Sequence, residues 1–249
     1  MPLEYLIFLT LLTPALVGVL NLIFHKNANV RDGVTLLGAL VTFYFSINIF
    51  LGFDGQAIQY NLVTIMPGIN IAFHVEPLGI IFSLLASSLW ILTHIYAIGY
   101  MRGAKEKNHS RFFLFFSVSI ASVMGISFSG NLFTLFLFYE LLTLITFPLV
   151  SHKGSSEALR GARVYLSILL GTSIGLQLLA IIWIYSSVGT LDFVKGGILN
   201  GSFGSIELII LVGLFAFGIG KAALFPFHKW LPAAMVAPTP VSALLHAVA

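Results

Sequence analysis

Ionisable side chains inside long apolar stretches are the residues of this sequence whose chemistry most needs explaining. Glu140 stands in the segment FYELL and Lys221 in GIGKAA, while His94 and His246 lie in two further apolar runs. Placing a charge near the centre of a bilayer costs about 2.5 kcal/mol or more, so such residues mark functional sites by default. Carboxyl, amine and imidazole groups can each hold or release a proton. These residue types therefore predict proton transfer through the protein.

Glu140 and Lys221 are expected to form a pair, because a buried carboxylate and a buried ammonium each lower the cost of the other's charge. Two plainer interpretations stay open: a protonated carboxyl group hydrogen-bonded to Thr143 or to a neighbouring helix, and a lysine that reaches the membrane interface near Lys229. Pro226 should interrupt the helix that carries Lys221, since proline lacks a backbone donor and clashes with the carbonyl four residues earlier. Broken helices at membrane depth line hydrated cavities, where ion sites are found.

Three histidines are weaker candidates for the same pathway. His246 follows the sequence Pro238-Thr239-Pro240 and should lie near Lys221, so a role in proton transfer is the favoured interpretation. His94 stands alone on an apolar helix, where a hydrogen-bonded packing residue is the commoner finding. His228 lies two residues after Pro226, and it could equally take up protons or anchor the chain at the interface.

The composition places these residues in a membrane protein. Only 8% of the 249 residues are charged, 58% are hydrophobic, and the mean hydropathy is +1.02, which excludes a soluble fold of this size. Cysteine is absent, so disulfides, thiolate nucleophiles and cysteine-ligated metal centres are excluded. The sequence contains no phosphate-binding loop and no H-E-x-x-H pair. We expect no catalytic chemistry, metal, cofactor or nucleic-acid partner for the chain.

The fold class expected is an all-α bundle of transmembrane helices. Residues 112–150 carry Glu140 as their only charge, and as one helix these 39 residues would be about 58 Å long, so they must fold back at Ser129-Gly130-Asn131. An eighth span opens at Pro238 and Pro240, but residues 241–249 are too few to cross a bilayer. We therefore expect a fragment, or a second polypeptide that continues after Ala249. The seven full spans are predicted at residues 5–24, 33–53, 77–101, 112–128, 132–150, 164–188 and, with a break, 208–231.

The distribution of basic residues predicts how the chain is oriented. Ten of the twelve lysines and arginines fall in loops on one side, which should face the cytoplasm and leave the N-terminus outside. The opposite loops hold only Lys195, and Lys221 lies within a span. The ten are Lys26, Arg31, Arg102, Lys105, Lys107, Arg111, Lys153, Arg160, Arg163 and Lys229.

Two segments resemble a known family of membrane subunits. The stretch GIGKAALFPFHKWLPAAMVAPTPVSALLHA is similar to the proton-translocation signature of antiporter-like subunits, and FYELLTLITFPLV is similar to the fifth helix of the same family. These subunits occur in Mrp-type multisubunit Na⁺/H⁺ antiporters, respiratory complex I and membrane-bound hydrogenases. SRFFLFFSVSIASVMGISFSGN and PLVSHKGSSEALRGARVYL favour the Mrp D-type branch.

The resemblance implies roles for individual residues. Glu140 would be the essential glutamate of helix five, Lys221 the lysine of the broken helix seven, and His246 the histidine that leads toward the central lysine. The family fold has two inverted repeats of about five helices each. Residues 1–106 would form the first three helices and residues 107–249 most of the first repeat, so transport would require further membrane subunits and the missing second repeat.

Three functions are therefore open. The favoured one is a proton-translocating subunit of a multisubunit cation/proton antiporter in the cell (inner) membrane, coupled to Na⁺ in the simplest case. The alternative is a proton-pumping subunit of complex I or of a membrane-bound hydrogenase, with its redox centres on other chains. A scaffold without transport would require Glu140 and Lys221 to be dispensable.

Overall fold

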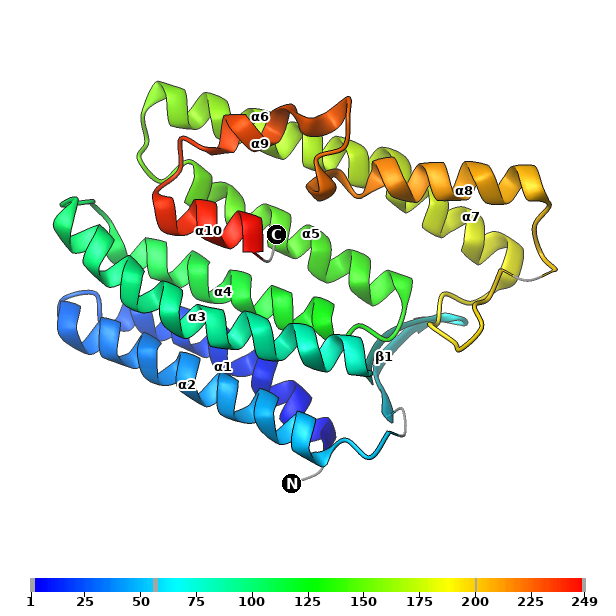
Figure 1. Cartoon of the computed structure of the whole chain (residues 1–249), viewed down its shortest axis with the longest axis horizontal. Coiled ribbons are helices and arrows are strands. Elements are labelled where there is room, and N and C mark those ends of the chain that lie inside the picture. The colour runs from blue at the N-terminus through cyan, green and yellow to red at the C-terminus, as the bar shows by residue number, and fades with distance from the viewer. Residues whose placement is uncertain (1–2, 56–57, 200, 248–249) are drawn as a thin grey trace.

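The computed structural model describes residues 3–55, 58–199 and 201–247, which form a helical bundle with a β-hairpin at one end (Figure 1). A π-helical turn, η1 (Ser173–Gln177), joins α6 and α7 into one helix. The helices are α1 (Leu3–Ile23), α2 (Ala28–Gly52), α3 (Pro77–Gly103), α4 (His109–Ser127), α5 (Leu132–Val150), α6 (Ser156–Thr172), α7 (Leu178–Val188), α8 (Ser205–Gly218), α9 (Trp230–Ala234) and α10 (Thr239–Ala247).

Within the described ranges, six helical stretches are long and apolar enough to cross a membrane: α1 to α5, and the stretch from α6 through α7. They correspond to the first six spans predicted from the sequence, and they indicate a multi-pass membrane protein. Helix α8 has 14 residues, or about 21 Å, which is shorter than the hydrocarbon core of about 30 Å. A seventh and an eighth span therefore stay predictions.

Local sequence signals explain several helix boundaries. The Asn131 side chain accepts a hydrogen bond from the Thr134 backbone N–H at 2.7 Å and so caps α5 where the apolar run folds back. Ser155 caps α6 in the same way, through the Ala158 N–H at 3.1 Å. Pro77 occupies the first turn of α3, where its missing N–H has no cost. The turn predicted at residues 129–131 is confirmed.

The expectation of an all-α fold is wrong in one region. Residues 54–76, which lie between the second and third predicted spans, contain an antiparallel hairpin of β1 (Ile58–Met66) and β2 (Ile69–Val75). Apolar residues at every second position of β2 fit a strand with one face against the bundle, and Gly68 adopts the positive φ of +78° in the turn. The Gly130 N–H donates to the Ala72 carbonyl at 2.8 Å, which ties the hairpin to the start of α5.

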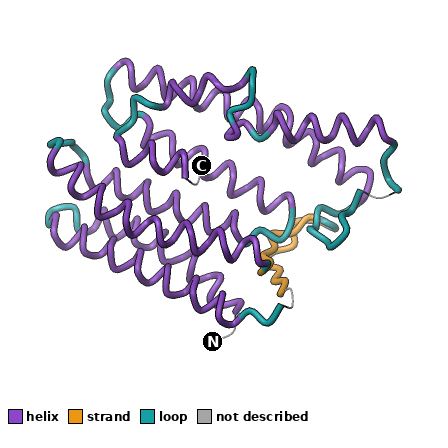
Figure 2. The backbone as a smooth tube through the Cα atoms, viewed as in Figure 1, coloured by secondary structure: helices purple, strands orange, loops and turns teal. Residues whose placement is uncertain are grey.

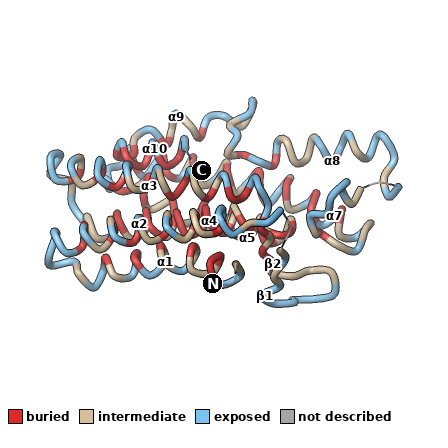
Figure 3. Tube along the Cα trace, turned by 60° about the horizontal axis from the view of Figure 1, so that its bottom comes forward, coloured by how far each residue is buried: buried red, intermediate tan, exposed pale blue. Residues whose placement is uncertain are grey.

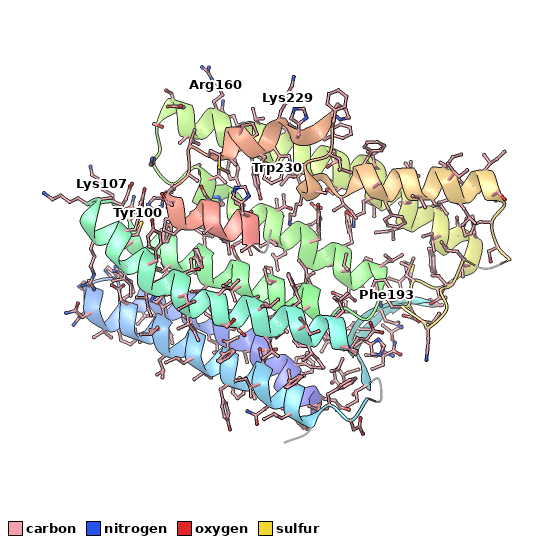
Figure 4. All side chains as sticks on the ribbon, viewed as in Figure 1. Tyr100, Lys107, Arg160, Phe193, Lys229 and Trp230 are labelled. Atoms are coloured by element: carbon pink, nitrogen blue, oxygen red, sulfur yellow. The ribbon has the colours of Figure 1, made fainter. Side chains whose placement is uncertain are left out.

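The loops gather at two opposite ends of the bundle. At one end the hairpin meets the α4–α5 turn and the segment after α7, through the bridges Phe73–Ser129 and Asn131–Asp192. At the other end lie the connections rich in basic residues, and Figure 4 shows Lys107 and Phe193 at these opposite ends. Buried residues lie between the helices, whereas α8 buries only Leu211 and Gly218 (Figure 3).

Candidate functional site

The helical path of α8 stops before Lys221. Helix α8 ends at Gly218, Ile219 leaves the helical region with φ −76° and ψ 69°, and Gly220–Ala222 form one 3₁₀ turn, η2. The chain then runs through a second 3₁₀ turn, η3 (Phe227–Lys229), into α9, and the Phe225–Pro226 peptide is cis. Figure 2 shows loop within the segment that joins α8 to α9. The sequence predicts an interruption between about Lys221 and Pro226, and in the structure the break begins at Ile219, two residues before Lys221.

Close packing against the π-helical turn accounts for this earlier end. A Cβ atom on Gly218 would stand 2.6 Å from the Gln177 backbone nitrogen, so only glycine fits there. Gly220 approaches the Thr172 hydroxyl in a similar way. A π-helical turn inside an α-helix is rare and is frequently found at functional sites.

Trp230 holds the backbone of the broken segment. Its indole Nε1–H donates to the Gly220 carbonyl at 2.8 Å, and its ring packs edge-on against Tyr165 with the ring centres 5.6 Å apart. In Figure 4 Trp230 projects toward the bundle while Lys229 projects away from it. The Gly220 carbonyl also accepts from the Ala223 N–H at 3.0 Å, so the indole supplies a second donor that ties α9 to the 3₁₀ turn.

The break places Lys221 against Tyr139 of α5. The ammonium Nζ donates to the Tyr139 backbone carbonyl at 3.0 Å and lies 4.0 Å from the centre of the Tyr139 ring. The Lys221 backbone N–H donates to the Tyr139 hydroxyl at 3.2 Å. The lysine thus sits on the residue next to Glu140.

Glu140 presents a buried carboxyl group to the described part of the bundle. Both of its oxygens are buried, and neither has a hydrogen-bond partner within the part of the chain that the structure describes. The Ser173 hydroxyl of η1 is the hydrogen-bond donor nearest to forming a bond with it, although the geometry of a hydrogen bond is not reached, and the Lys221 ammonium acts on it through its charge. The three ion pairs among the described residues all lie elsewhere, so no salt bridge joins Glu140 to Lys221. A buried, unpaired carboxyl group is suited to holding a proton.

Two family models match this chain. The family model described as NADH:quinone oxidoreductase/Mrp antiporter, TM, matches residues 129–249. The one described as NADH-Ubiquinone oxidoreductase (complex I), chain 5 N-terminus, matches residues 65–113. The chain belongs to the antiporter-like membrane subunit family.

Curated relatives of this antiporter-like protein carry two kinds of name. A probable K(+)/H(+) antiporter subunit of Rhizobium meliloti is 36% identical over 72% of this chain and 18% of its own length. The "NAD(P)H-quinone oxidoreductase subunit 5, chloroplastic" of Ipomoea purpurea is 32% identical over 96% of this chain and 36% of its own length. The "Putative antiporter subunit mnhA2" of Staphylococcus haemolyticus is 33% identical over 92% of this chain and 29% of its own length. The chain thus spans well under half the length of these relatives.

A solved structure shares the fold. In the membrane-bound sulfane sulfur reductase, an archaeal respiratory membrane complex, one chain superposes with a TM-score of 0.82 at 22% identity, covering 96% of this chain and 38% of that one. None of the three relatives above is named as a D-type protein. Their names therefore give no support to the D-type branch favoured from the sequence.

The three histidines make other contacts or are exposed, as far as the structure describes them. His246 is exposed on α10, and His228 is exposed with its ring stacked on Phe225 at 5.7 Å. His94 is 1% exposed, and its Nε2 lies 3.0 Å from the Asp32 carbonyl. Among the described residues, no hydrogen bond or ring contact joins any of the three to Lys221, and their roles stay predictions.

Polar residues that the sequence analysis did not single out surround the site. They are Tyr139, Ser173, Gln177, and the pair Thr146 and Tyr165, whose hydroxyl oxygens lie 2.6 Å apart. The Gln177 side-chain oxygen is buried without a partner in the described structure. The spacing of Ser173 and Gln177 could have identified these two residues in the sequence. They are four residues apart and so fall on one face of an apolar helix.

A second polar cluster lies at the basic end of the bundle. Asp32 accepts from Arg31 at 2.7 Å and from Arg102 at 2.5 Å, and both Arg31 and Asp32 are buried. Arg31 also lies 3.5 Å from the Nδ1 of His109. These contacts join α2, α3 and α4. Within the described ranges no group of three His, Asp or Glu residues is placed to hold a metal ion.

Proposed function

We propose that the chain is a proton-translocating subunit of a multisubunit cation/proton antiporter in the cell (inner) membrane. The observation that carries this proposal is the Glu140 carboxyl group, whose buried oxygens accept no hydrogen bond from the described residues, one residue from the tyrosine that holds Lys221. Ionisable groups kept at membrane depth mark proton pathways, because each can exist charged or neutral according to its neighbours. Other membrane subunits and lipid are the expected partners, with the N-terminus outside.

In this proposal each ionisable group carries out one step of proton transfer. Glu140 takes up or releases a proton at a boundary with a neighbouring subunit. Lys221 holds the proton as an ammonium and hands it on, and His246 carries it toward the remainder of the complex. Na⁺ is the coupled cation in the simplest version, since relatives from Staphylococcus aureus are named as Na(+)/H(+) antiporter subunits.

The second candidate is a proton-pumping subunit of a redox-driven complex. Relatives named NAD(P)H-quinone oxidoreductase subunit 5 and the fold shared with a sulfane sulfur reductase complex favour it. The chain's own residues would act in the same way in both. The driving force would differ, being a cation gradient in one case and an electron donor in the other.

Substitutions that remove the ionisable group of Glu140 or of Lys221 test the proposal. In proteoliposomes that contain the purified complex, Glu140→Gln and Lys221→Ala should each lower the rate of ΔpH formation at least about tenfold, because a group that cannot exchange protons stops a relay. Glu140→Asp should keep part of the rate, since its carboxyl group still titrates. ΔpH is measured on adding Na⁺ for an antiporter, or an electron donor for a pump.

Glu157 provides the matched control. It is an exposed glutamate in the first turn of α6, so Glu157→Gln makes the same chemical change outside the site. This variant should transport at the wild-type rate. Near-normal transport by Glu140→Gln in an assembled complex would show that Glu140 is structural and that the proposed relay is wrong.

A further inference from the structure

Tyr139 contacts Lys221 with three separate groups. Its hydroxyl accepts from the Lys221 backbone N–H at 3.2 Å, and its backbone carbonyl accepts from the ammonium at 3.0 Å. Its ring lies under the ammonium at 4.0 Å. Tyr139 is itself 7% exposed, so its side chain has a fixed place in the bundle. One residue of α5 therefore holds both the backbone and the charged end of the lysine.

The hydroxyl contact replaces a helical hydrogen bond. In an uninterrupted helix the Lys221 N–H would donate to the Phe217 carbonyl, four residues earlier. Helix α8 ends at Gly218, so this bond is not made and the N–H needs another acceptor. A backbone donor without an acceptor is costly in apolar surroundings. The Tyr139 hydroxyl supplies the acceptor and so fixes the backbone at the break.

The other two contacts stabilise the ammonium without an ion pair among the described residues. The face of an aromatic ring carries negative electrostatic potential and attracts a cation, most strongly where water is excluded. The Tyr139 carbonyl adds a partial negative charge, and it also accepts from the Thr143 hydroxyl at 3.0 Å. The neighbouring Glu140 oxygens have no hydrogen-bond partner in the described structure. The ammonium is thus stabilised beside the carboxyl group without forming an ion pair with it.

We propose that Tyr139 is a positioning residue for proton transfer, and that it holds Lys221 beside Glu140 through its hydroxyl, ring and carbonyl. This inference rests on the proposed function. The hydroxyl determines where the Lys221 backbone lies, and the ring and carbonyl determine where its ammonium lies. Two parts of the Tyr139 side chain therefore have separable effects on transport.

Two substitutions separate those parts in the purified complex. Tyr139→Phe removes the hydroxyl and keeps the ring, and should lower the initial rate of ΔpH formation about threefold to tenfold, the usual cost of one hydrogen bond. Tyr139→Leu also removes the ring and should lower the rate further. Because the ring stabilises the charged ammonium, its loss should move the alkaline limb of the rate profile to lower pH, by about 0.5 to 1 pH unit.

Tyr185→Phe is the matched control. The Tyr185 hydroxyl donates to the Pro67 carbonyl at 2.7 Å at the hairpin end, so this change also removes one hydroxyl-to-backbone hydrogen bond. Its rate and pH profile should equal those of the wild type. A wild-type rate for Tyr139→Leu would overturn the inference. So would a lower rate that follows a lower thermal stability while the pH profile stays unchanged, because that result indicates a structural role.

The same assay separates this inference from the proposed function. If Glu140→Gln and Lys221→Ala transport normally, the proposed relay fails and Tyr139 has nothing to position. If those two variants are inactive while Tyr139→Leu matches the wild type at every pH, only the positioning role fails.

Discussion

Glu140 and Tyr139 are adjacent in the sequence but face different surroundings in the bundle. Successive residues of a helix point about 100° apart, so Glu140 lies toward Ser173 while Tyr139 lies under Lys221. Residue type alone identified Glu140 and Lys221, because a charge in an apolar run is conspicuous. Tyrosine is unremarkable there, and its contacts depend on where the broken segment folds. The sequence therefore could not predict the role of Tyr139.

His152, just beyond the end of α5, should make stability depend on pH. Burial lowers the pKa of its imidazole, and the nearby Arg111 guanidinium lowers it further. The folded protein therefore holds His152 neutral at pH values where the unfolded chain binds a proton. The stability that this group contributes is fully present above the ordinary imidazole pKa of 6.5, and it is lost as the pH falls below that value.

The measurement is the melting temperature of the solubilised complex between about pH 7.5 and about pH 5.5, around the usual imidazole range. The decrease toward low pH should be shallower in His152→Asn than in the wild type. His25, whose ring is exposed, provides the control, and His25→Asn should leave the slope unchanged. Equal slopes in wild type and His152→Asn would contradict the assignment.

At the scale of elements, the sequence predicted helix boundaries best where a nearby residue caps the helix or turns the chain. The boundaries predicted for α5 agree with the structure at both ends, because Asn131 both turns the chain and caps the helix. The hairpin was missed although apolar residues stand at every second position of β2, because the same stretch carries turn residues such as Gly68. Its stability comes from contacts with the α4–α5 turn, such as the 2.8 Å bond from His74 N–H to the Phe128 carbonyl.

The contact between the end of α8 and the π-helical turn should be sensitive to a single methyl group. Gly218→Ala would press its Cβ onto the Gln177 backbone, which cannot move aside without displacing η1. Overpacking of this kind typically costs about 1 to 3 kcal/mol. We expect a lower melting temperature and reduced transport, since Lys221 follows the displaced segment.

Gly213, on the same helix, provides the control. No atom lies within 4 Å of a Cβ built there, so Gly213→Ala should be neutral, or stabilising by about 0.5 to 1 kcal/mol through helix propensity. Both variants are compared by thermal melting and by ΔpH formation in the same preparation. Equal melting temperatures for the two variants would show that the close approach at Gly218 is unimportant.

At the scale of the molecule, the two ends of the bundle differ in charge and in structure. The hairpin end holds Lys195 and the bridge from Asn131 to Asp192, while the other end holds the buried pair Arg31 and Asp32 and most of the basic loops. For the first six spans the grouping of loops predicted from the sequence agrees with the structure, because each of these apolar runs reverses the chain direction. Which end faces the cytoplasm depends on the membrane, so it stays a prediction.

Cysteine labelling tests that orientation. The chain contains no cysteine, so one introduced residue is the only thiol of this protein that can react. Lys107 and Lys195 are both exposed lysines, and they lie in loops at opposite ends of the bundle. With basic loops on the cytoplasmic side, a membrane-impermeant maleimide added to intact cells should label Lys195→Cys and leave Lys107→Cys unlabelled. Permeabilised cells should show labelling of both, which confirms that each thiol is reactive. If only Lys107→Cys is labelled in intact cells, the chain has the opposite orientation in the membrane. The side from which Glu140 and Lys221 exchange protons would then also be the opposite one.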